Sequence, residues 1–358
     1  MPIHSGKPTQ RAFGADYRGD HLNRIAFPMG GLGAGMICLE GTGALSHVSL
    51  RHKPAVFHEP MMFSALWVRD TESPLVLEGA VPRWKAYGNA GNGNGRHAGC
   101  AAGLPRFKDC DFAARFPFAT VRMRDASLPV SVELTGWSPF VPGDADASSL
   151  PVLALEYVLR NPGPRPVQGV YSFHAANDMA LGRDRGAEIR SLSQGFILAQ
   201  PPVPGQPAAE GYLAAFVNDP ATAADLAWFR GGWYDPLTML WRRIERGFAE
   251  AQGPHAGQPG GGGSLYLPFD LPPGGSKTIC LQLAWYVPFS DVQYNVAAPA
   301  CCGDPARLDA PHDTYRASYT QRFDGIESMA AFWRKEIEPL RRASRSFSDC
   351  FYDTTLPP

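Results

Sequence analysis

Apolar and polar residues alternate one by one along three segments between Phe116 and Phe173. The apolar members are Ala119, Val121 and Met123 in the first segment, Val130, Val132 and Leu134 in the second, and Leu153, Leu155, Tyr157 and Leu159 in the third. A period of two residues is typical of half-buried strands, because successive side chains of a strand point to opposite faces. The run Asn161-Pro162-Gly163-Pro164 ends the third segment, since proline cannot donate to a ladder and glycine admits turn geometry. The pattern predicts an all-β fold, a large two-sheet antiparallel β-sandwich.

Later segments extend this fold and add helices. Residues 279–285 alternate again directly after the turn residues Pro272-Pro273-Gly274-Gly275, which predicts another strand. Residues 238–252 place Leu240, Ile244 and Phe248 at helical spacing, and we expect a helical insertion on the sandwich surface there.

A second amphipathic helix is predicted from Ile326 to Leu340, where Pro339 is expected to kink or end it. Such a helix needs a surface to pack on. We therefore divide the chain into a β-sandwich domain, residues 1–325, and a helix with linker, residues 326–358, and interpret the chain as a fragment of a longer protein.

Composition indicates a globular protein with a substantial core. The 358 residues are 44% hydrophobic, and 33 Lys and Arg against 34 Asp and Glu give a net charge of -1, which does not favour nucleic acid or an anionic membrane as partner. The first residues lack the pattern of a secretory signal, and no apolar stretch approaches the length of a membrane span. Seven scattered cysteines fit reduced thiols better than a disulfide framework, so we expect a cytoplasmic protein.

A glycine-rich loop follows Pro28 in the run FPMGGLGAG. It resembles a phosphate-binding loop, but Met36-Ile37 stands where a P-loop needs Lys and then Ser or Thr, and the spacing also misses G-x-G-x-x-G. We favour the simpler interpretation that these glycines permit positive φ or close backbone approach at a sheet edge or domain contact.

Other chemistry-bearing residues point to ordinary structural roles. His47, His52 and His58 with Glu59 have no spacing of a helical zinc site, and the vicinal pair Cys301-Cys302 has no Cys-x-x-Cys partner. Asp144 and Asp146 lie in the polar run GDADASS, where aspartate normally caps a turn. No cofactor and no metal site are predicted.

The order of several blocks resembles the N-terminal domain of glycoside hydrolase family 116, the family of bile-acid β-glucosidase and non-lysosomal glucosylceramidase. The blocks are FPMGGLGAG, EPMMFSALWV, the region from Phe116 to Phe173, LPPGGSKTICLQLAWYVP and YRASYTQRF. Within the first block, Pro28, Gly30, Gly31, Gly33 and Gly35 match the family's glycine run.

The resemblance implies a non-catalytic domain. In the family both catalytic carboxylates lie in a C-terminal helical-toroid, (α/α)6 domain, so no catalytic residue is assigned here and the chain alone is expected to be inactive. The parent protein would be a retaining β-glucosidase or glucosylceramidase acting on a β-glucoside or glycolipid. The domain would support the catalytic domain, its partner, and wall the substrate cleft.

Six residues are candidates for contact with that partner or its cleft: Gly30, Gly31, Gly33, Gly35, Phe332 and Trp333. Phe332 and Trp333 would belong to an apolar patch, or they would pack on the sandwich as ordinary core. The alternative function, from a different class, is a free-standing carbohydrate-binding β-sandwich module.

Overall fold

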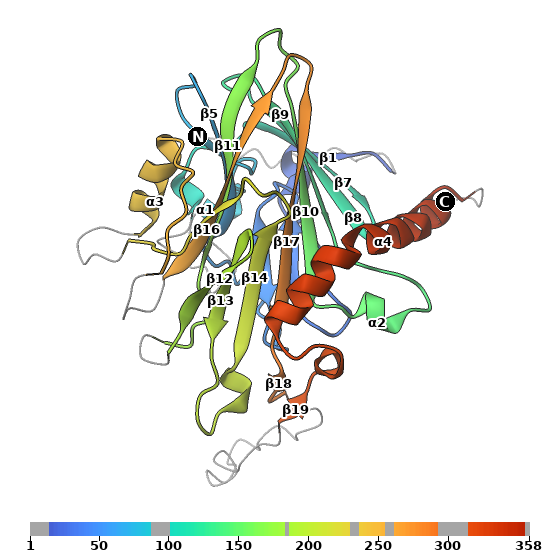
Figure 1. Ribbon diagram of the computed structural model, residues 1–358. Helices are drawn as coiled ribbons and strands as arrows, with labels where there is room; N and C mark the ends of the chain where they lie inside the picture. Colours follow the sequence, from blue (N-terminus) through green and yellow to red (C-terminus); the bar gives the residue numbers. More distant parts are fainter. Residues whose placement is uncertain are drawn as a thin grey trace.

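Two antiparallel sheets stacked face to face form the body of the protein (Figure 1). The computed structural model describes residues 14–86, 101–182, 186–229, 236–254, 261–292 and 314–354. In order across the larger, nine-stranded sheet the strands are β1 (Tyr17–Arg18), β7 (Asp109–Arg115), β8 (Phe118–Arg124), β9 (Ser131–Trp137), β10 (Val152–Arg160), β17 (Ser276–Tyr286), β14 (Gly211–Val217), β13 (Gly195–Gln200) and β12 (Glu188–Leu192). The five-stranded sheet contains, in order, β15 (Ala223–Asp225), β16 (Gly262–Leu271), β11 (Val167–Ala176), β5 (Met62–Val68) and β6 (Leu75–Val76). The predicted all-β sandwich is confirmed.

Two smaller sheets complete the described part of the chain. One is three-stranded, with β2 (Ala26–Met29), β3 (Met36–Glu40) and β4 (Leu45–Ser49); the other pairs β18 (Phe289–Ser290) with β19 (Tyr315–Arg316). Side chains of β2, β3 and β4 join the same apolar core as the two large sheets.

The alternation read from the sequence places its apolar residues in that core. Leu155 on β10 and Leu283 on β17 are fully buried there, and the turn after Leu271 contains Gly274 with a φ of 69°. The opposite face of β10 is also buried, since Val152 and Ala154 lie in a second apolar cluster outside the sandwich. The larger sheet is therefore covered on both faces.

Helix α4 (Ile326–Tyr352) covers this outer face and crosses the nine-stranded sheet obliquely (Figure 1). The helix begins at the predicted residue but runs twelve residues beyond Leu340 without stopping at Pro339. Pro339 is exposed, and the residue four positions earlier, Lys335, has a side chain that is 82% exposed, so water can satisfy the carbonyl that proline leaves without a donor. Of the two outcomes expected at Pro339, a kink or an end of the helix, the end is wrong for this reason.

The remaining helices are short. Helix α3 (Pro236–Glu245) lies on the outer side of the five-stranded sheet, where Leu240 and Ile244 are buried. The predicted helix continued to Gln252, but it ends at Glu245 because Gly247 adopts a φ of 63° against the ring of Trp67. One-turn helices are α1 (Arg83–Ala86) and α2 (Ala145–Ser148). In the described ranges no helix is both long and apolar enough to cross a membrane.

Candidate functional site

The glycine run forms a tight loop between β2 and β3. Gly30, Gly33 and Gly35 have φ values of 137°, 73° and 95°, in the region that favours glycine. A Cβ on Gly31 would lie 2.4 Å from the carbonyl oxygen of Leu150, so close approach also requires glycine here. The loop leads into strand β3 and not into a helix, which removes the helix N-terminus that a phosphate-binding loop uses.

Two contacts fix this loop on the sandwich. The indole Nε1 of the fully buried Trp285 donates to the carbonyl of Ala34 at 2.6 Å, and the amide of Leu32 donates to the carbonyl of Ser148 at 2.8 Å. The side chain of Leu32 nevertheless remains 60% exposed. The loop is thus rigidly seated and presents an apolar residue to the surface.

The two aromatic candidates on α4 face the sandwich to different extents. Trp333 is fully buried, its ring centroid is 5.5 Å from that of Trp137, and its Nε1 donates to the carbonyl of Leu153. Phe332 is half-buried and contacts Phe323 edge-on at 5.3 Å. Trp333 therefore belongs to the core of this chain and not to an exposed patch.

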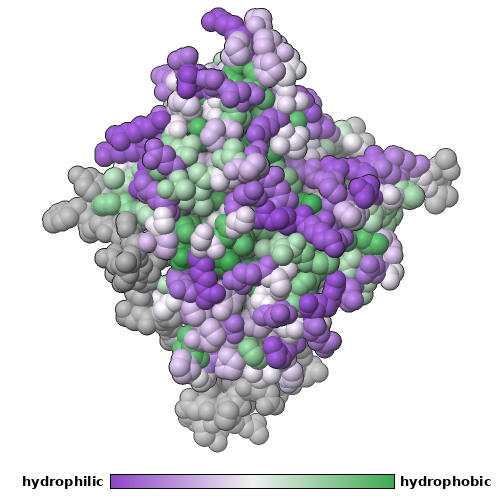
Figure 2. All heavy atoms as spheres, viewed as in Figure 1, coloured by the Kyte–Doolittle hydropathy of each residue, from purple (hydrophilic) through white to green (hydrophobic). Residues whose placement is uncertain are grey.

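A different group of aromatic side chains gathers where the second half of α4 passes the sheet. We call it the aromatic surface, and it comprises Phe27, Phe116, Phe140, Phe347, Phe351 and Tyr352, each ring within 6.4 Å of another member. Phe116, Phe351 and Tyr352 are 36%, 61% and 42% exposed. Figure 2 shows apolar residues on the side of α4 that faces α2.

The aromatic surface and the glycine loop are neighbours. Phe27 lies on β2, immediately before the loop, and Ser138, two residues before Phe140, donates to the carbonyl of Gly30 at 3.2 Å. Contiguous exposed apolar groups on a protein surface often mark an interaction site. The sequence analysis missed Phe347, Phe351 and Tyr352 because it ended the helix before them; the aromatic spacing of four residues in a continued helix would have been the signal.

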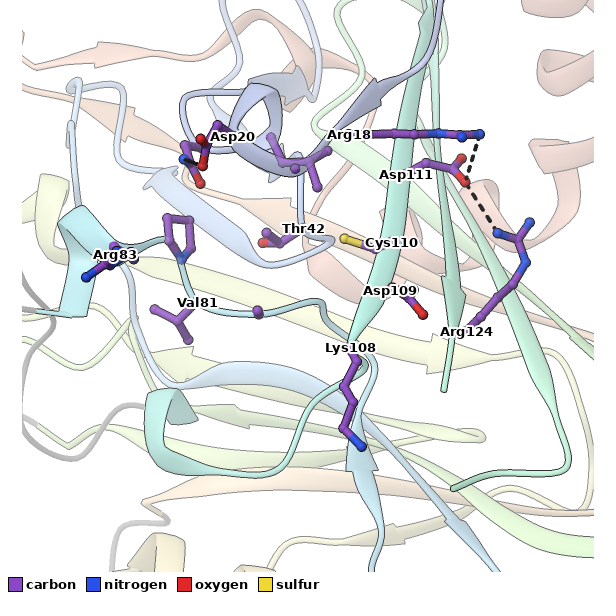
Figure 3. A pocket seen from close by; sticks show the side chains of 15 residues that line it. Arg18, Asp20, Thr42, Val81, Arg83, Lys108, Asp109, Cys110, Asp111 and Arg124 are labelled. Carbon is purple, nitrogen blue, oxygen red and sulfur yellow. Dashed lines mark hydrogen bonds and ion pairs between the residues drawn. The ribbon is translucent and has the colours of Figure 1, made fainter. Parts of the chain in front are cut away.

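A hollow of about 550 Å³ lies at the edge of the nine-stranded sheet (Figure 3). The carboxylate of Asp111 on β7 is 3.9 Å from Arg18, 2.9 Å from Arg122 and 3.6 Å from Arg124, all measured to guanidinium nitrogens. These ion pairs join β1, β7 and β8. Burial raises the pKa of the nearby Cys110 thiol to about 11, which keeps it a poor nucleophile. These ion pairs stabilise the sheet edge, and they leave the carboxylate of Asp111 committed to its guanidinium partners.

The three histidines do not converge on one point. His47 contacts Ser46, and His52 Nε2 donates to the carbonyl of Val287 at 2.9 Å. His58 pairs with Asp178 at 2.8 Å, and Glu59 pairs with the buried Lys85. Each has its own structural partner.

The remaining candidates follow the simpler interpretation where the structure describes them. Asp144 is the N-cap of α2, and its Oδ1 accepts from the amide of Ala147 at 2.9 Å, as expected for an aspartate at a turn. Asp146 lies in the first turn of the same helix. Cys301 and Cys302 lie outside the described residues.

The solved structures that match the chain are remote in sequence. They include "Putative kojibiose phosphorylase from human microbiome", with 9% identity and a TM-score of 0.38, covering 92% of this chain and 31% of that one. "Polysaccharide Lyase BACCELL_00875" has 12% identity and a TM-score of 0.33, covering 77% of this chain and 33% of that one. The chain thus spans about a third of the length of each. No curated protein matches the sequence.

Residues 26–339 match the family described as beta-glucosidase 2, glycosyl-hydrolase family 116 N-term. The match includes the glycine loop, every strand of both large sheets except β1, and α4 as far as Pro339. The chain therefore belongs to glycoside hydrolase family 116, as its N-terminal domain.

Proposed function

We propose that this domain is the non-catalytic partner of a helical-toroid, (α/α)6 catalytic domain in the same protein, a retaining β-glucosidase or glucosylceramidase. The aromatic surface carries the proposal. It combines exposed rings on α4 with the adjoining glycine loop, on a chain of the family's N-terminal domain. We assign docking to the aromatic surface and Leu32, with Gly30, Gly31, Gly33 and Gly35 holding the loop close to the substrate cleft.

Ion pairs beside the rings favour a defined orientation. Arg115 contacts Asp349 at 3.3 Å and Asp353 at 2.5 Å, and the hydroxyl of Tyr352 accepts from the amide of Phe116 at 3.0 Å. These contacts hold the last turn of α4 against the loop between β7 and β8. A preorganised apolar surface loses less conformational entropy on docking than a mobile one.

We also place the protein in the cytoplasm. Cys38, Cys110, Cys280 and Cys350 are all free thiols, which suits a reducing compartment.

The test mixes the purified chain with the separately expressed catalytic domain of the same protein. The chain alone should not hydrolyse an aryl β-glucoside, because both carboxylates of a double displacement are placed in the other domain. Adding the catalytic domain should raise the melting temperature of the chain by mass action. Turnover by the chain alone after rigorous purification would overturn the assignment.

A matched pair of variants locates the docking surface. Phe351→Asp places a charge on the aromatic surface and should weaken association by at least tenfold. Tyr315→Ala removes an aromatic ring that is 58% exposed on β19, outside that surface, and should leave association unchanged. Equal affinities for the two variants would exclude the aromatic surface as the docking site.

A further inference from the structure

Arg345, on the second half of α4, is a positive charge without an ion pair in the part of the chain that the structure describes. Its guanidinium carbon lies 3.9 Å from the centre of the Phe118 ring on β8. No described residue accepts a hydrogen bond from it. A contact with the face of a ring uses no hydrogen-bond acceptor, so the N–H donors of the guanidinium stay available.

Two other arginines beside it are already paired. Arg341, one turn earlier, donates to both carboxylate oxygens of Glu156, at 2.6 and 2.7 Å. Arg115 contacts Asp349 at 3.3 Å. Asp349 stands one turn after Arg345, at the spacing of an ion pair along a helix, but its carboxylate faces Arg115 instead. Arg345 is therefore the arginine of this group that lacks a carboxylate.

The surroundings of Arg345 disfavour its charge. Burial lowers the pKa of Arg345, and the like charges of Arg341 and Arg115 lower it further. Asp349 and Glu156 act in the opposite direction, but they are engaged by the other two arginines. A further carboxylate close to the guanidinium would stabilise its charged form. The region thus selects an anionic group from a partner.

Arg345 borders the aromatic surface. Each residue of an α-helix is turned by about 100° from the one before, so residues seven apart share a flank. Tyr352, which belongs to the aromatic surface and is 42% exposed, is seven residues after Arg345. Phe347 and Phe351 lie on the other flank, across the buried Ser348. The aromatic surface thus continues around the end of α4 toward Arg345.

A docked domain is large enough to reach both flanks. A stable interface covers about 800 Å² on each partner, which corresponds to a patch roughly 30 Å across. A helix such as α4 is only about 10 Å wide. A domain seated on the exposed rings therefore also covers the flank that carries Arg345, and there it needs a group that can pair with a cation shielded from water.

We propose that Arg345 forms an ion pair with a carboxylate of the catalytic domain that docks on the aromatic surface. This inference rests on the proposed function and adds the chemistry of the partner, an apolar patch with an aspartate or glutamate at its edge. A guanidinium binds a carboxylate through two parallel hydrogen bonds, which fixes the register of docking as well as adding affinity. Other partners are disfavoured, because covering Arg345 without a carboxylate leaves a charge without compensation.

The first test uses the full-length protein that contains this domain, with the substitution Arg345→Lys. A water-soluble carbodiimide links the introduced amine to a carboxylate in direct contact with it, and mass spectrometry of the peptides identifies that residue. We expect a link from position 345 to an aspartate or glutamate of the catalytic domain. Lys335, whose side chain is 82% exposed on the first half of the same helix, is the internal control and should give no link to that domain.

A second probe separates this inference from the proposed function. A photoreactive benzophenone amino acid replaces Phe351 in the aromatic surface, and it reports docking without involving a charge. If position 351 links to the catalytic domain and position 345 links only to carboxylates of this chain, such as Asp349, the ion pair is overturned and the docking stands. If neither position links to the catalytic domain, both proposals are overturned.

Affinity measurements with the separately expressed catalytic domain test the charge. Arg345→Met keeps an unbranched side chain on the ring of Phe118 but removes the cation, and it should weaken association by about tenfold at low salt. The difference from the wild type should shrink as the salt concentration rises, because salt screens the lost attraction. Arg345→Lys keeps the charge and should retain most of the affinity. Wild-type affinity in folded Arg345→Met would contradict the ion pair.

The matched control is Arg334→Met. Arg334 also lies over a ring on the same helix, at 4.6 Å from the centre of Phe216, but its guanidinium donates to Gln194 at 2.7 Å and to the carbonyl of Ser193 at 2.8 Å. Its removal changes the net charge by the same amount and should leave association unchanged. Equal weakening by the two methionine variants would mean that net charge, and not a pair with Arg345, sets the affinity.

Discussion

The two halves of α4 contact the same sandwich in opposite ways. The first half buries large apolar residues against the outer face of the sheet, among them Met329, Trp333 and Ile337. In the second half the buried residues are Ser344 and Ser348, and the aromatic rings remain partly exposed. In Figure 1 the helix leaves the nine-stranded sheet toward its C-terminal end. One helix thus closes the core of this domain with its first half and carries exposed aromatic rings on its second half.

The largest predicted change in stability comes from a substitution in the first half of α4. Trp333→Ala should lower the free energy of unfolding by about 3–5 kcal/mol, because it opens a cavity beneath Trp137 and removes the bond to the Leu153 carbonyl. Urea denaturation measures the change. Lys335→Ala, two residues away with its side chain 82% exposed, is the control and should change stability by less than about 0.5 kcal/mol. A loss below about 1 kcal/mol for Trp333→Ala would show that α4 is not part of the core.

The next largest change in stability is expected where the two halves of α4 meet. Glu156 on β10 accepts from Trp137 Nε1 at 2.8 Å and from Arg341 Nε at 2.6 Å, and the hydrogen bond to Glu156 raises the pKa of Arg341. Glu156→Gln keeps the shape but leaves the guanidinium without its opposite charge. The side chain of Arg341 is 33% exposed, so we expect a loss of about 1–3 kcal/mol in the free energy of unfolding, below the range for fully buried pairs.

The control for this change is Glu133→Gln. Glu133 on β9 is 3.4 Å from Arg122 and 3.7 Å from Arg160, but its side chain is 29% exposed, against 11% for Glu156. Glu133→Gln should lower the free energy of unfolding by no more than about 1 kcal/mol in the same urea denaturation. Equal losses for the two variants would mean that the Arg341 contact adds no more than a surface ion pair.

The sandwich could be predicted from the sequence because its strands follow a local rule. Leu155 and Leu283 are buried, as their alternation with polar residues indicated. The outer face was less predictable. Val152 and Ala154 are buried only because α4, more than 170 residues later in the chain, returns to cover them, and no local pattern specifies such a contact.

The candidate surface was predicted in part. The glycine run marked a place of close approach, and Gly30, Gly31 and Gly35 do require glycine. The exposed rings were missed because proline normally ends a helix. Pro339 is tolerated because it lies on the solvent side of α4, and the packing of the helix on the sheet decides which side that is. The contact of His58 with Asp178 could not be predicted either, because the two residues lie 120 positions apart in the sequence.

The smallest predicted effect belongs to the end of α4. Phe351 is 61% exposed, and its neighbours are rings that are themselves partly exposed, so Phe351→Ala should change the free energy of unfolding of the isolated chain by no more than about 0.5 kcal/mol. The loss in the free energy of unfolding caused by Trp333→Ala should therefore be at least about six times the loss caused by Phe351→Ala, although both variants truncate an aromatic side chain on the same helix. A loss above about 1.5 kcal/mol would mean that Phe351 contributes to the core of the isolated chain. The second half of α4 would then resemble the first in its contribution to the stability of the isolated chain.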